Sequence, residues 1–547
     1  MIDVREIARQ RLRRESGYTV KDWGGRIPVA IVYPNSYYIG MSNLAVQTIY
    51  SLLNAYPDFV CERAFYDPPA PEDPPPPPVV SMESQRPLGD FAVLAFTLAY
   101  EFDYFNMVQA LTSAGIPLWA DQRDERHPLV IAGGACMITN PAVVAPFLDA
   151  AVAGEGEETV PALVDAWRDG LFGSREELLD ELAKIPGVYV PSRLPEGDAV
   201  ERQWVRDIAQ TAAYSSVITE DTELSNMTLI EVARGCGRGC RFCIAGYVFR
   251  PPRYRPLEDL LGIVEQALPV SDRVGLLGAA VADHPQLPEL VLGARELGAR
   301  VSISSLRVDN LHPEILRGIA EGGTKTVTVA PEAGSERLRA AINKGVSEEQ
   351  ILDGAALVGE SGARRLKMYF MIGLPGEEDD DVHAMATLGN RIKQRLDAAG
   401  HGTRLVMGVS PLVPKPWTAY QYQVQTDAAT IKRRQAILKQ NLAPGIEMRS
   451  DSPRAARIDD VLSRGDARVA TMLAELPDPS LGAYGRAIRE HGLDGPFPWA
   501  SEQPPWQVVD VGMTERFLLR EMDKHDRVKS TIACPPPEVG CKLCGVC

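Results

Sequence analysis

The sequence lacks the features that would place it in a membrane or on a nucleic acid. No stretch approaches the ~18 consecutive apolar residues that a membrane-spanning helix needs. Residues 1–16 are polar and rich in arginine, without the apolar centre of a secretion signal. The 547 residues carry a formal net charge of −16, which removes the usual electrostatic attraction to nucleic acid. We therefore expect a cytoplasmic protein without a membrane partner, and the charge indicates no nucleic-acid partner.

Histidine pairs and disulfide patterns are also missing. The seven histidines are scattered without metal-binding spacing, so none is predicted to be a ligand, although His284 falls near the expected site. The nine cysteines are unevenly spaced, and C-x2-C pairs in a chain without a secretion signal favour metal binding over disulfides. Hydrophobic residues make up 45% of the chain and charged residues 24%, which is ordinary for a globular protein with a sizeable core.

The most informative run is residues 234–243, Arg-Gly-Cys-Gly-Arg-Gly-Cys-Arg-Phe-Cys. It places Cys236, Cys240 and Cys243 at C-x3-C-x2-C spacing. Thiolates this close suit an iron–sulfur cluster or zinc, but both usually take four protein ligands. Three thiolates on a four-iron cluster would leave one iron open to bind a small molecule. A buried thiol cluster or a zinc knuckle is the alternative interpretation.

This run resembles the signature of the radical S-adenosylmethionine (SAM) superfamily, including the aromatic Phe242 before the last cysteine. The resemblance implies that Cys236, Cys240 and Cys243 hold a [4Fe–4S] cluster whose open iron binds SAM. It also implies that the reduced cluster cleaves SAM to a 5′-deoxyadenosyl radical. An electron donor such as flavodoxin or ferredoxin is the implied partner.

Strand-like and helical patterns alternate along two stretches of the chain. In the first stretch, buried strands are predicted at residues 27–33, 91–97, 128–132 and 150–153, and Asn43 is predicted to cap a helix. In the second, strands are predicted at residues 228–233, 274–277, 300–304, 326–329, 366–371 and 405–409. This alternation favours an α/β fold, with a doubly wound parallel sheet followed by a partial (β/α)6 barrel of the radical SAM type.

The same patterns predict the domain organisation. We expect a Rossmann-like domain at residues 1–170, which the family resemblance implies is cobalamin-binding-like, and a connecting segment at 171–225. The radical SAM partial barrel is expected at 226–425, and a small C-terminal helical and cysteine-rich region at 426–547.

The resemblance places further cofactor-binding residues at the ends of barrel strands. It implies that Phe242, Gly278, Ser304 and Glu332 lie near SAM. An ordinary tight turn explains Gly278 equally well, and a solvent-facing strand position explains Ser304. Glu332 is a carboxylate that is costly to bury without a partner. The run Gly-Leu-Pro-Gly-Glu at 373–377 resembles a turn that shapes the wall against adenine.

A second group of cysteines occupies the C-terminal tail. It consists of Cys534, Cys541, Cys544 and Cys547. Four thiolates are enough to close a metal site, and an auxiliary four-iron cluster and a structural zinc both fit.

Other runs resemble a subgroup of bacterial radical SAM proteins with a cobalamin-binding-like N-terminal domain; they begin at Tyr33, Cys61, Tyr100, Pro414 and Ser463. Cobalamin domains carry Asp-x-His-x-x-Gly, but the matching stretch at 35–40 has no histidine. Some cobalamin-dependent relatives also lack it. The glycines at 133–134 and 154–156 could accept the nucleotide tail of cobalamin or form ordinary tight turns. Both interpretations stay open, and cobalamin is predicted only as a possible cofactor.

The predicted function is a radical SAM enzyme acting on an unidentified substrate, with methyl transfer if cobalamin is bound. One alternative is a sulfur-inserting or methylthiolating enzyme that uses the tail cluster. The other is a non-catalytic cobalamin- or metal-sensing protein that uses the barrel as a scaffold.

Overall fold

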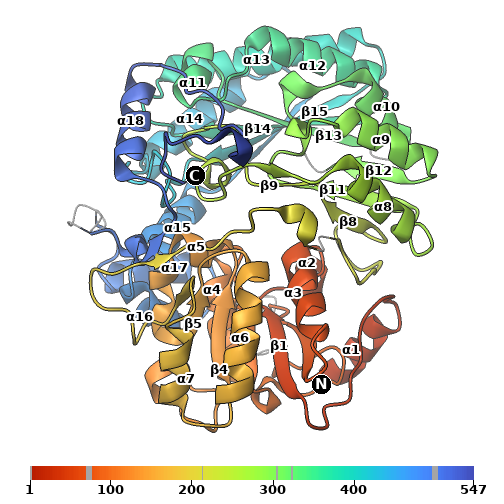
Figure 1. The fold of residues 1–547 in the computed structure, drawn as a ribbon. Coiled ribbons are helices and arrows are strands. Elements are labelled where there is room, and N and C mark those ends of the chain that lie inside the picture. Colours follow the sequence, from red (N-terminus) through yellow and green to blue (C-terminus); the bar gives the residue numbers. More distant parts are fainter. Residues whose placement is uncertain are drawn as a thin grey trace. The chain divides into compact units, whose positions relative to one another are not determined.

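The computed structural model describes residues 3–68, 77–211, 214–303, 306–321, 325–495 and 503–546. The chain forms two compact units, and each unit is assembled from two separate stretches (Figure 1). The first unit comprises Met1–Thr228 and Val461–Gly512, and the second comprises Leu229–Asp460 and Met513–Cys547. This division differs from the expected four segments, because residues 171–225 belong to the first unit and the C-terminal region is shared between both units.

The first unit is built on a six-stranded sheet with the order β2-β1-β3-β4-β5-β6. Its strands are β1 (Ile27–Tyr33), β2 (Phe59–Phe65), β3 (Val93–Thr97), β4 (Leu129–Gly133), β5 (Ala150–Val152) and β6 (Val188–Tyr189). All neighbours pair in parallel except β6, which is antiparallel to β5. The four predicted strands are all present, and the predicted parallel α/β fold is confirmed.

β2 is not among the predicted strands, because its centre carries the charged residues Glu62 and Arg63. The Arg63 side chain is fully buried, and its guanidinium lies 2.7 Å from carboxylate oxygens of both Glu15 and Glu83. These partners compensate the desolvation of the charge. A segment that looks like a polar loop in the sequence is therefore a fully buried strand at the edge of the sheet.

The helices of the first unit come from both of its stretches. The helices are α1 (Val4–Leu12), α2 (Tyr37–Gly40), α3 (Leu44–Asn54), α4 (Asp103–Ser113), α5 (Ala135–Thr139), α6 (Gly156–Gly170), α7 (Arg175–Leu182), α16 (Arg468–Glu475) and α17 (Leu481–Glu490). Asn43 caps α3 as predicted, because its side chain accepts the Ala45 N–H. The second stretch packs near the carboxyl end of β4, where the Asn140 amide donates to the carbonyls of Ser463 (3.0 Å) and Gly465 (2.8 Å).

The second unit contains two parallel sheets. The strand order is β12-β11-β8 in one sheet and β13-β14-β15-β16 in the other. The strands are β8 (Thr228–Glu231), β11 (Arg273–Leu277), β12 (Arg300–Ile303), β13 (Thr326–Glu332), β14 (Arg365–Ile372), β15 (Arg404–Pro411) and β16 (Ile446–Ser450). No strand pairing closes these sheets into a full barrel within the described ranges. The predicted partial barrel is confirmed, with β16 as an additional edge strand.

Helices lie between and after these strands along the chain. They are α8 (Leu257–Ala267), α9 (Leu287–Glu296), α10 (Pro313–Glu321), α11 (Glu336–Ala341), α12 (Glu348–Glu360), α13 (Asp379–Ala398), α14 (Ala428–Asn441), α15 (Pro453–Arg464) and α18 (Glu515–Asp526). Ser347 and Gln350 form a capping box at the start of α12. None of the helices in the described part of the chain is long and apolar enough to span a bilayer.

Candidate active site

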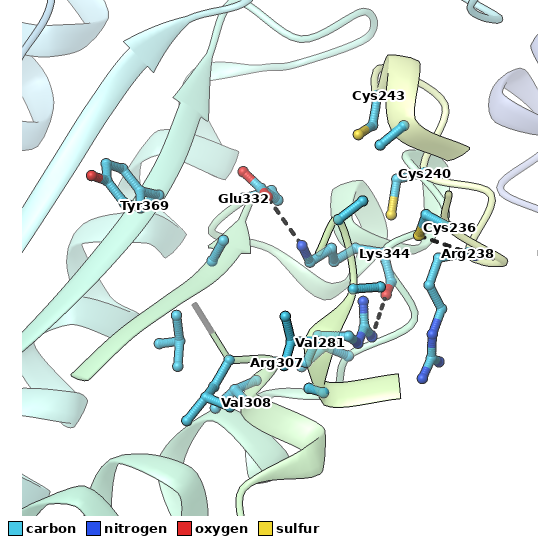
Figure 2. A pocket seen from close by; sticks show the side chains of 18 of the residues that line it. Cys236, Arg238, Cys240, Cys243, Val281, Arg307, Val308, Glu332, Lys344 and Tyr369 are labelled. Carbon is cyan, nitrogen blue, oxygen red and sulfur yellow. Dashed lines mark hydrogen bonds and ion pairs between the residues drawn. The ribbon is translucent and has the colours of Figure 1, made fainter. Parts of the chain in front are cut away.

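The three cysteines of the central run lie in the loop that follows β9 (Ala233–Arg234). We call residues 235–243 the cysteine loop. Cys236, Cys240 and Cys243 all line one cavity of about 250 Å³, and Figure 2 shows them together along one side of it. The Arg238 N–H donates to the Cys236 sulfur at 3.4 Å, a bond that favours the thiolate form. The site thus lies at the carboxyl end of the first barrel strand, as predicted.

Glycines allow the cysteine loop to pass close to neighbouring backbone. Gly235 has a φ of +75°, and a Cβ there would lie 2.1 Å from the Phe249 carbonyl oxygen. A Cβ on Gly237 would lie 2.8 Å from the carbonyl oxygen of Cys534. Both positions therefore require glycine, because a larger residue would push backbone atoms apart.

Burial disfavours the thiolate form of all three cysteines. Burial raises the pKa of Cys236 and Cys240, and it raises the pKa of Cys243 to about 12. The thiols are therefore protonated at neutral pH unless a metal is bound, because metal coordination deprotonates them.

No three His, Cys, Asp or Glu side chains within the described residues stand close enough together to hold one metal ion. In a four-iron cluster each thiolate binds a different iron, so the thiols need not converge on one point. The three sulfurs facing one cavity fit that arrangement.

Ion pairs supply the charged lining of this cavity. The Lys344 ammonium lies 3.0 Å from the Glu332 carboxylate, and Figure 2 shows this pair facing the cysteines. Arg307 pairs with Asp309 at 2.9 Å and also donates to the Lys344 carbonyl at 3.2 Å. Each of these two cations thus has a carboxylate partner.

Glu332 combines burial with an uncommon backbone conformation. Its φ is +70°, and the register of β13 against β14 shifts between Val329 and Glu332. Burial raises the pKa of its carboxyl, while Lys344 acts in the opposite direction. The strand therefore bends at this point and turns the carboxylate into the cavity.

The remaining residues that were predicted to lie near SAM differ in whether they line the cavity. Phe242 lines the cavity. A Cβ on Gly278 would lie 2.7 Å from the Ala233 carbonyl oxygen, so the close approach of β9 requires this glycine, and its neighbours Ala279 and Ala280 line the cavity. Ser304 lies outside the described residues.

Sequence reasoning missed several lining residues, among them the polar side chains of Arg307, Lys344 and Tyr369. Tyr369 lies on β14, where exposure alternates with a period of two residues, and its ring lies 4.6 Å from the Lys367 ammonium. That alternation is a signal that marks the inner face of a strand. Lys344 and Arg307 lie in loops and carry no comparable pattern.

The turn at residues 373–377 follows β14 and is held by charge. The Gly373 N–H donates to the Glu377 carboxylate at 2.6 Å, and Arg434 of α14 pairs with the same oxygen at 2.8 Å. Burial nevertheless raises the pKa of Glu377 to about 7. This carboxylate ties the turn to α14.

The tail cysteines are separate from this cavity. Cys534 lines a neighbouring cavity of about 480 Å³ together with Arg238 and His284. The carbonyl of the buried Cys544 accepts the Thr514 N–H at 2.9 Å, and the Cys541 sulfur accepts the Leu543 N–H at 3.5 Å. Cys547 lies outside the described residues.

His284 lies near the expected site but both of its ring nitrogens are engaged. Nε2 lies 2.9 Å from the Arg255 carbonyl oxygen, and Nδ1 accepts the Gln286 N–H at 3.1 Å. With both nitrogens engaged, the ring of His284 holds the backbone at Arg255 and Gln286 and presents no open nitrogen to a metal.

Two glycines of the first unit, Gly134 and Gly154, lie directly against the backbone of other segments. A Cβ on Gly134 would lie 2.6 Å from the Leu98 carbonyl oxygen, and one on Gly154 would lie 2.4 Å from that of Gln203. Both glycines have a positive φ. Both glycines are therefore required by the close approach of other backbone segments, and the binding of a nucleotide tail at these loops stays a prediction.

Two family models match the chain. One describes the N-terminal part of radical SAM proteins and matches residues 45–191. The other describes the radical SAM superfamily and matches residues 230–389, which include the cysteine loop and Glu332. The chain belongs to the radical SAM superfamily.

Several curated proteins are similar to this radical SAM enzyme. An uncharacterised protein of Methanocaldococcus jannaschii is 28% identical and covers 83% of this chain and 92% of its own. An uncharacterised methyltransferase of Pyrococcus horikoshii is 23% identical and covers 48% of this chain and 58% of its own. A tRNA-2-methylthio-N(6)-dimethylallyladenosine synthase of Sorangium cellulosum is 27% identical and covers 29% and 37%. The matched region thus covers less than two thirds of the length of the methyltransferase and of the synthase, the two relatives here whose names state an activity.

Among solved structures, the radical SAM methyltransferase TsrM of Kitasatospora setae, with cobalamin and a [4Fe–4S] cluster bound, is similar to this radical SAM enzyme. It is 13% identical, covers 86% of this chain and 100% of its own, and gives a TM-score of 0.49.

Proposed function

We propose that this radical SAM enzyme binds a [4Fe–4S] cluster through Cys236, Cys240 and Cys243 and binds SAM in the adjoining cavity. The supporting observation is that all three thiols of the cysteine loop face one cavity, which Phe242 and Glu332 also line. With the cluster bound, the site would supply one electron for the reductive cleavage of SAM. An electron donor of the flavodoxin or ferredoxin type would provide that electron.

The chain's own residues would bind and orient SAM. Glu332 and Lys344 offer a carboxylate and an ammonium 3.0 Å apart, and these suit the amino and carboxylate groups of SAM. Ala279, Ala280 and Val308 are apolar residues that also line the cavity. Exclusion of water would protect a reactive radical from side reactions.

We propose methyl transfer as the reaction class, since the relatives with named activities include a methyltransferase and methylthiotransferases. Methylthiolation is the second candidate, and the cysteine-rich tail favours it because an auxiliary cluster could take part in sulfur chemistry. Quantifying cobalamin in protein purified anaerobically with cobalamin supplied would separate the two routes.

The decisive experiment is SAM cleavage by the anaerobically reconstituted chain. Wild type should form 5′-deoxyadenosine with dithionite, and the triple variant with Cys236, Cys240 and Cys243 changed to Ala should not. The variant Cys136→Ala removes a buried thiol in the first unit and is the matched control, which should retain cleavage. Cleavage by the triple variant would rule out the radical SAM reaction at this site.

A further inference from the structure

A C-terminal segment of the second unit lies along the cysteine loop. We call residues 529–534 the strap; Figure 1 shows the dark blue end of the chain beside the yellow-green loop after β9. The Cys534 N–H donates to the Gly237 carbonyl at 2.6 Å. Asn343 connects the loop to the strap. Its side-chain N–H donates to the Gly239 carbonyl at 3.0 Å, and its side-chain oxygen accepts the Thr531 N–H at 2.9 Å.

The third contact is made by Arg241, which lies between two of the cysteines. Its side chain is fully buried, and its guanidinium donates to the carbonyl of Lys529 at 2.7 Å and to the carbonyl of Ala341. It also pairs with the Glu521 carboxylate of α18 at 3.2 Å. A buried guanidinium needs several such partners, so its position is tightly specified.

The carboxylate of Glu521 joins the strap to the same network. It is fully buried and accepts the Thr531 hydroxyl at 2.5 Å. The Lys524 ammonium lies 2.9 Å from its other oxygen and 2.8 Å from the Thr531 hydroxyl. Arg241 of the loop, Lys524 of α18 and Thr531 of the strap thus all contact the Glu521 carboxylate. Together with the hydrogen bonds at Gly237 and Gly239, this links three residues of the cysteine loop to the strap and its neighbours.

The cysteine loop depends on these external contacts. It contains Gly235, Gly237 and Gly239, and no helix or strand is assigned between residues 235 and 243. Glycine-rich backbone has a large conformational freedom that must be restricted for three thiols to face one cavity. The strap and α18 provide that restriction.

We propose that the strap and α18 position the cysteine loop for cluster binding, with Arg241 and Glu521 as positioning residues. The inference rests on the proposed function, since it assumes a cluster at Cys236, Cys240 and Cys243. The far C-terminal residues are thereby part of the cofactor site although they supply no ligand to this cluster. Loosening the strap should release iron and change the cluster's environment without unfolding the barrel.

Gly237 offers a sharp test, because the Cys534 carbonyl occupies the space of its missing Cβ at 2.8 Å. The change Gly237→Ala displaces the strap and removes no ligand or charge. Gly262→Ala in α8 is the matched control, since nothing lies within 4 Å of its added Cβ. Thr531→Val is a milder second variant that removes only the hydroxyl.

The experiment compares the reconstituted full-length variants by two readouts, iron release to a ferrous chelator and the electron paramagnetic resonance spectrum of the reduced cluster with and without SAM. To isolate the loop cluster, all variants also carry Cys541→Ala and Cys544→Ala. Gly237→Ala and Thr531→Val should release iron ~10-fold faster, as expected for a lost hydrogen bond, and should lose or weaken the SAM-dependent spectral change. Gly262→Ala should behave as the parent.

Two results would overturn the proposal. If both strap variants keep the parent's iron release and SAM-dependent spectrum, the strap does not position the loop, while the proposed function stands. If the parent itself binds no cluster at the three cysteines, the proposed function fails and this inference fails with it. If Gly237→Ala does not fold, Thr531→Val alone decides the outcome.

Discussion

Glu332 stands in the left-handed backbone region that residues other than glycine seldom occupy. Such a conformation costs free energy and persists only where surrounding structure enforces it, as at functional sites. Here the register shift in β13 and the ion pair with Lys344 enforce it. The carboxylate is thus held in the cavity by backbone in an uncommon conformation.

The change Glu332→Gln should therefore weaken SAM binding by ~1.5–3 kcal/mol, the range for a hydrogen bond to a charged group. Isothermal titration of SAM into the reconstituted protein measures this. Glu360→Gln, at an exposed position at the end of α12, is the control and should leave affinity unchanged. If Glu332→Gln lowers only the melting temperature, the carboxylate has a structural role alone.

Asp103 gives a pH-dependent prediction in the first unit. Burial raises the pKa of its carboxyl to about 6, although hydrogen bonds from Asn35 and Asn106 lower it. Because the folded pKa lies above the unfolded one, the folded state binds more protons between them. The free energy of unfolding should then fall as the pH rises from ~4 to ~6, by up to ~3 kcal/mol.

Urea unfolding at pH 4.5, 5.5 and 7, followed by tryptophan fluorescence, tests this. Asp103→Asn removes the titrating group, so its unfolding free energy should depend less on pH than that of wild type. The exposed Asp169→Asn in α6 should leave the pH dependence unchanged. Equal pH slopes in wild type and Asp103→Asn would show that Asp103 does not titrate in this range.

At the scale of elements, the turn after β11 depends on close backbone approach to β9. Gly278 has room for no side chain, because a Cβ would lie 2.7 Å from the Ala233 carbonyl oxygen. Gly278→Ala should destabilise the second unit by ~1–3 kcal/mol, the usual cost of overpacking. Urea unfolding measures this, and Gly262→Ala should change stability by less than ~1 kcal/mol. A neutral Gly278→Ala would mean that the turn relaxes without cost.

Elements with one dominant signal could be predicted from the sequence. The apolar strands 27–33 and 405–409 and the capped helices are present, because burial on both faces and capping are local properties. β2 could not be predicted, because its charges are neutralised by Glu15 and Glu83 from other parts of the chain. β16 has three polar residues among five and lies at a sheet edge, so its sequence carries little burial signal.

The candidate site follows the same rule. The cysteines were predictable because their spacing is itself the chemical requirement. Lys344 and Arg307 reach the cavity from loops, and Arg241 depends on contacts with residues nearly 300 positions away, such as Lys529. No local sequence pattern encodes contacts of that kind.

At the scale of the whole molecule, the tail is a second candidate metal centre. We expect the chain lacking Cys236, Cys240 and Cys243 to retain about four irons after reconstitution, because four cysteines suffice for a second cluster. Metal analysis after gel filtration measures this. Adding Cys541→Ala and Cys544→Ala should remove the metal. Stoichiometric zinc with little iron would mean a structural knuckle, and no metal of either kind would contradict the prediction.

The interleaved order of the units constrains when the enzyme becomes competent in the cell. The ribosome makes the cysteine loop roughly 290 residues before the end of the strap, a delay of ~15–60 s at ordinary rates of bacterial synthesis. Each unit also waits for a late stretch of chain before its core is complete. On the proposed role of the strap, nascent chains would therefore expose unsecured thiols until residues 529–534 have been made.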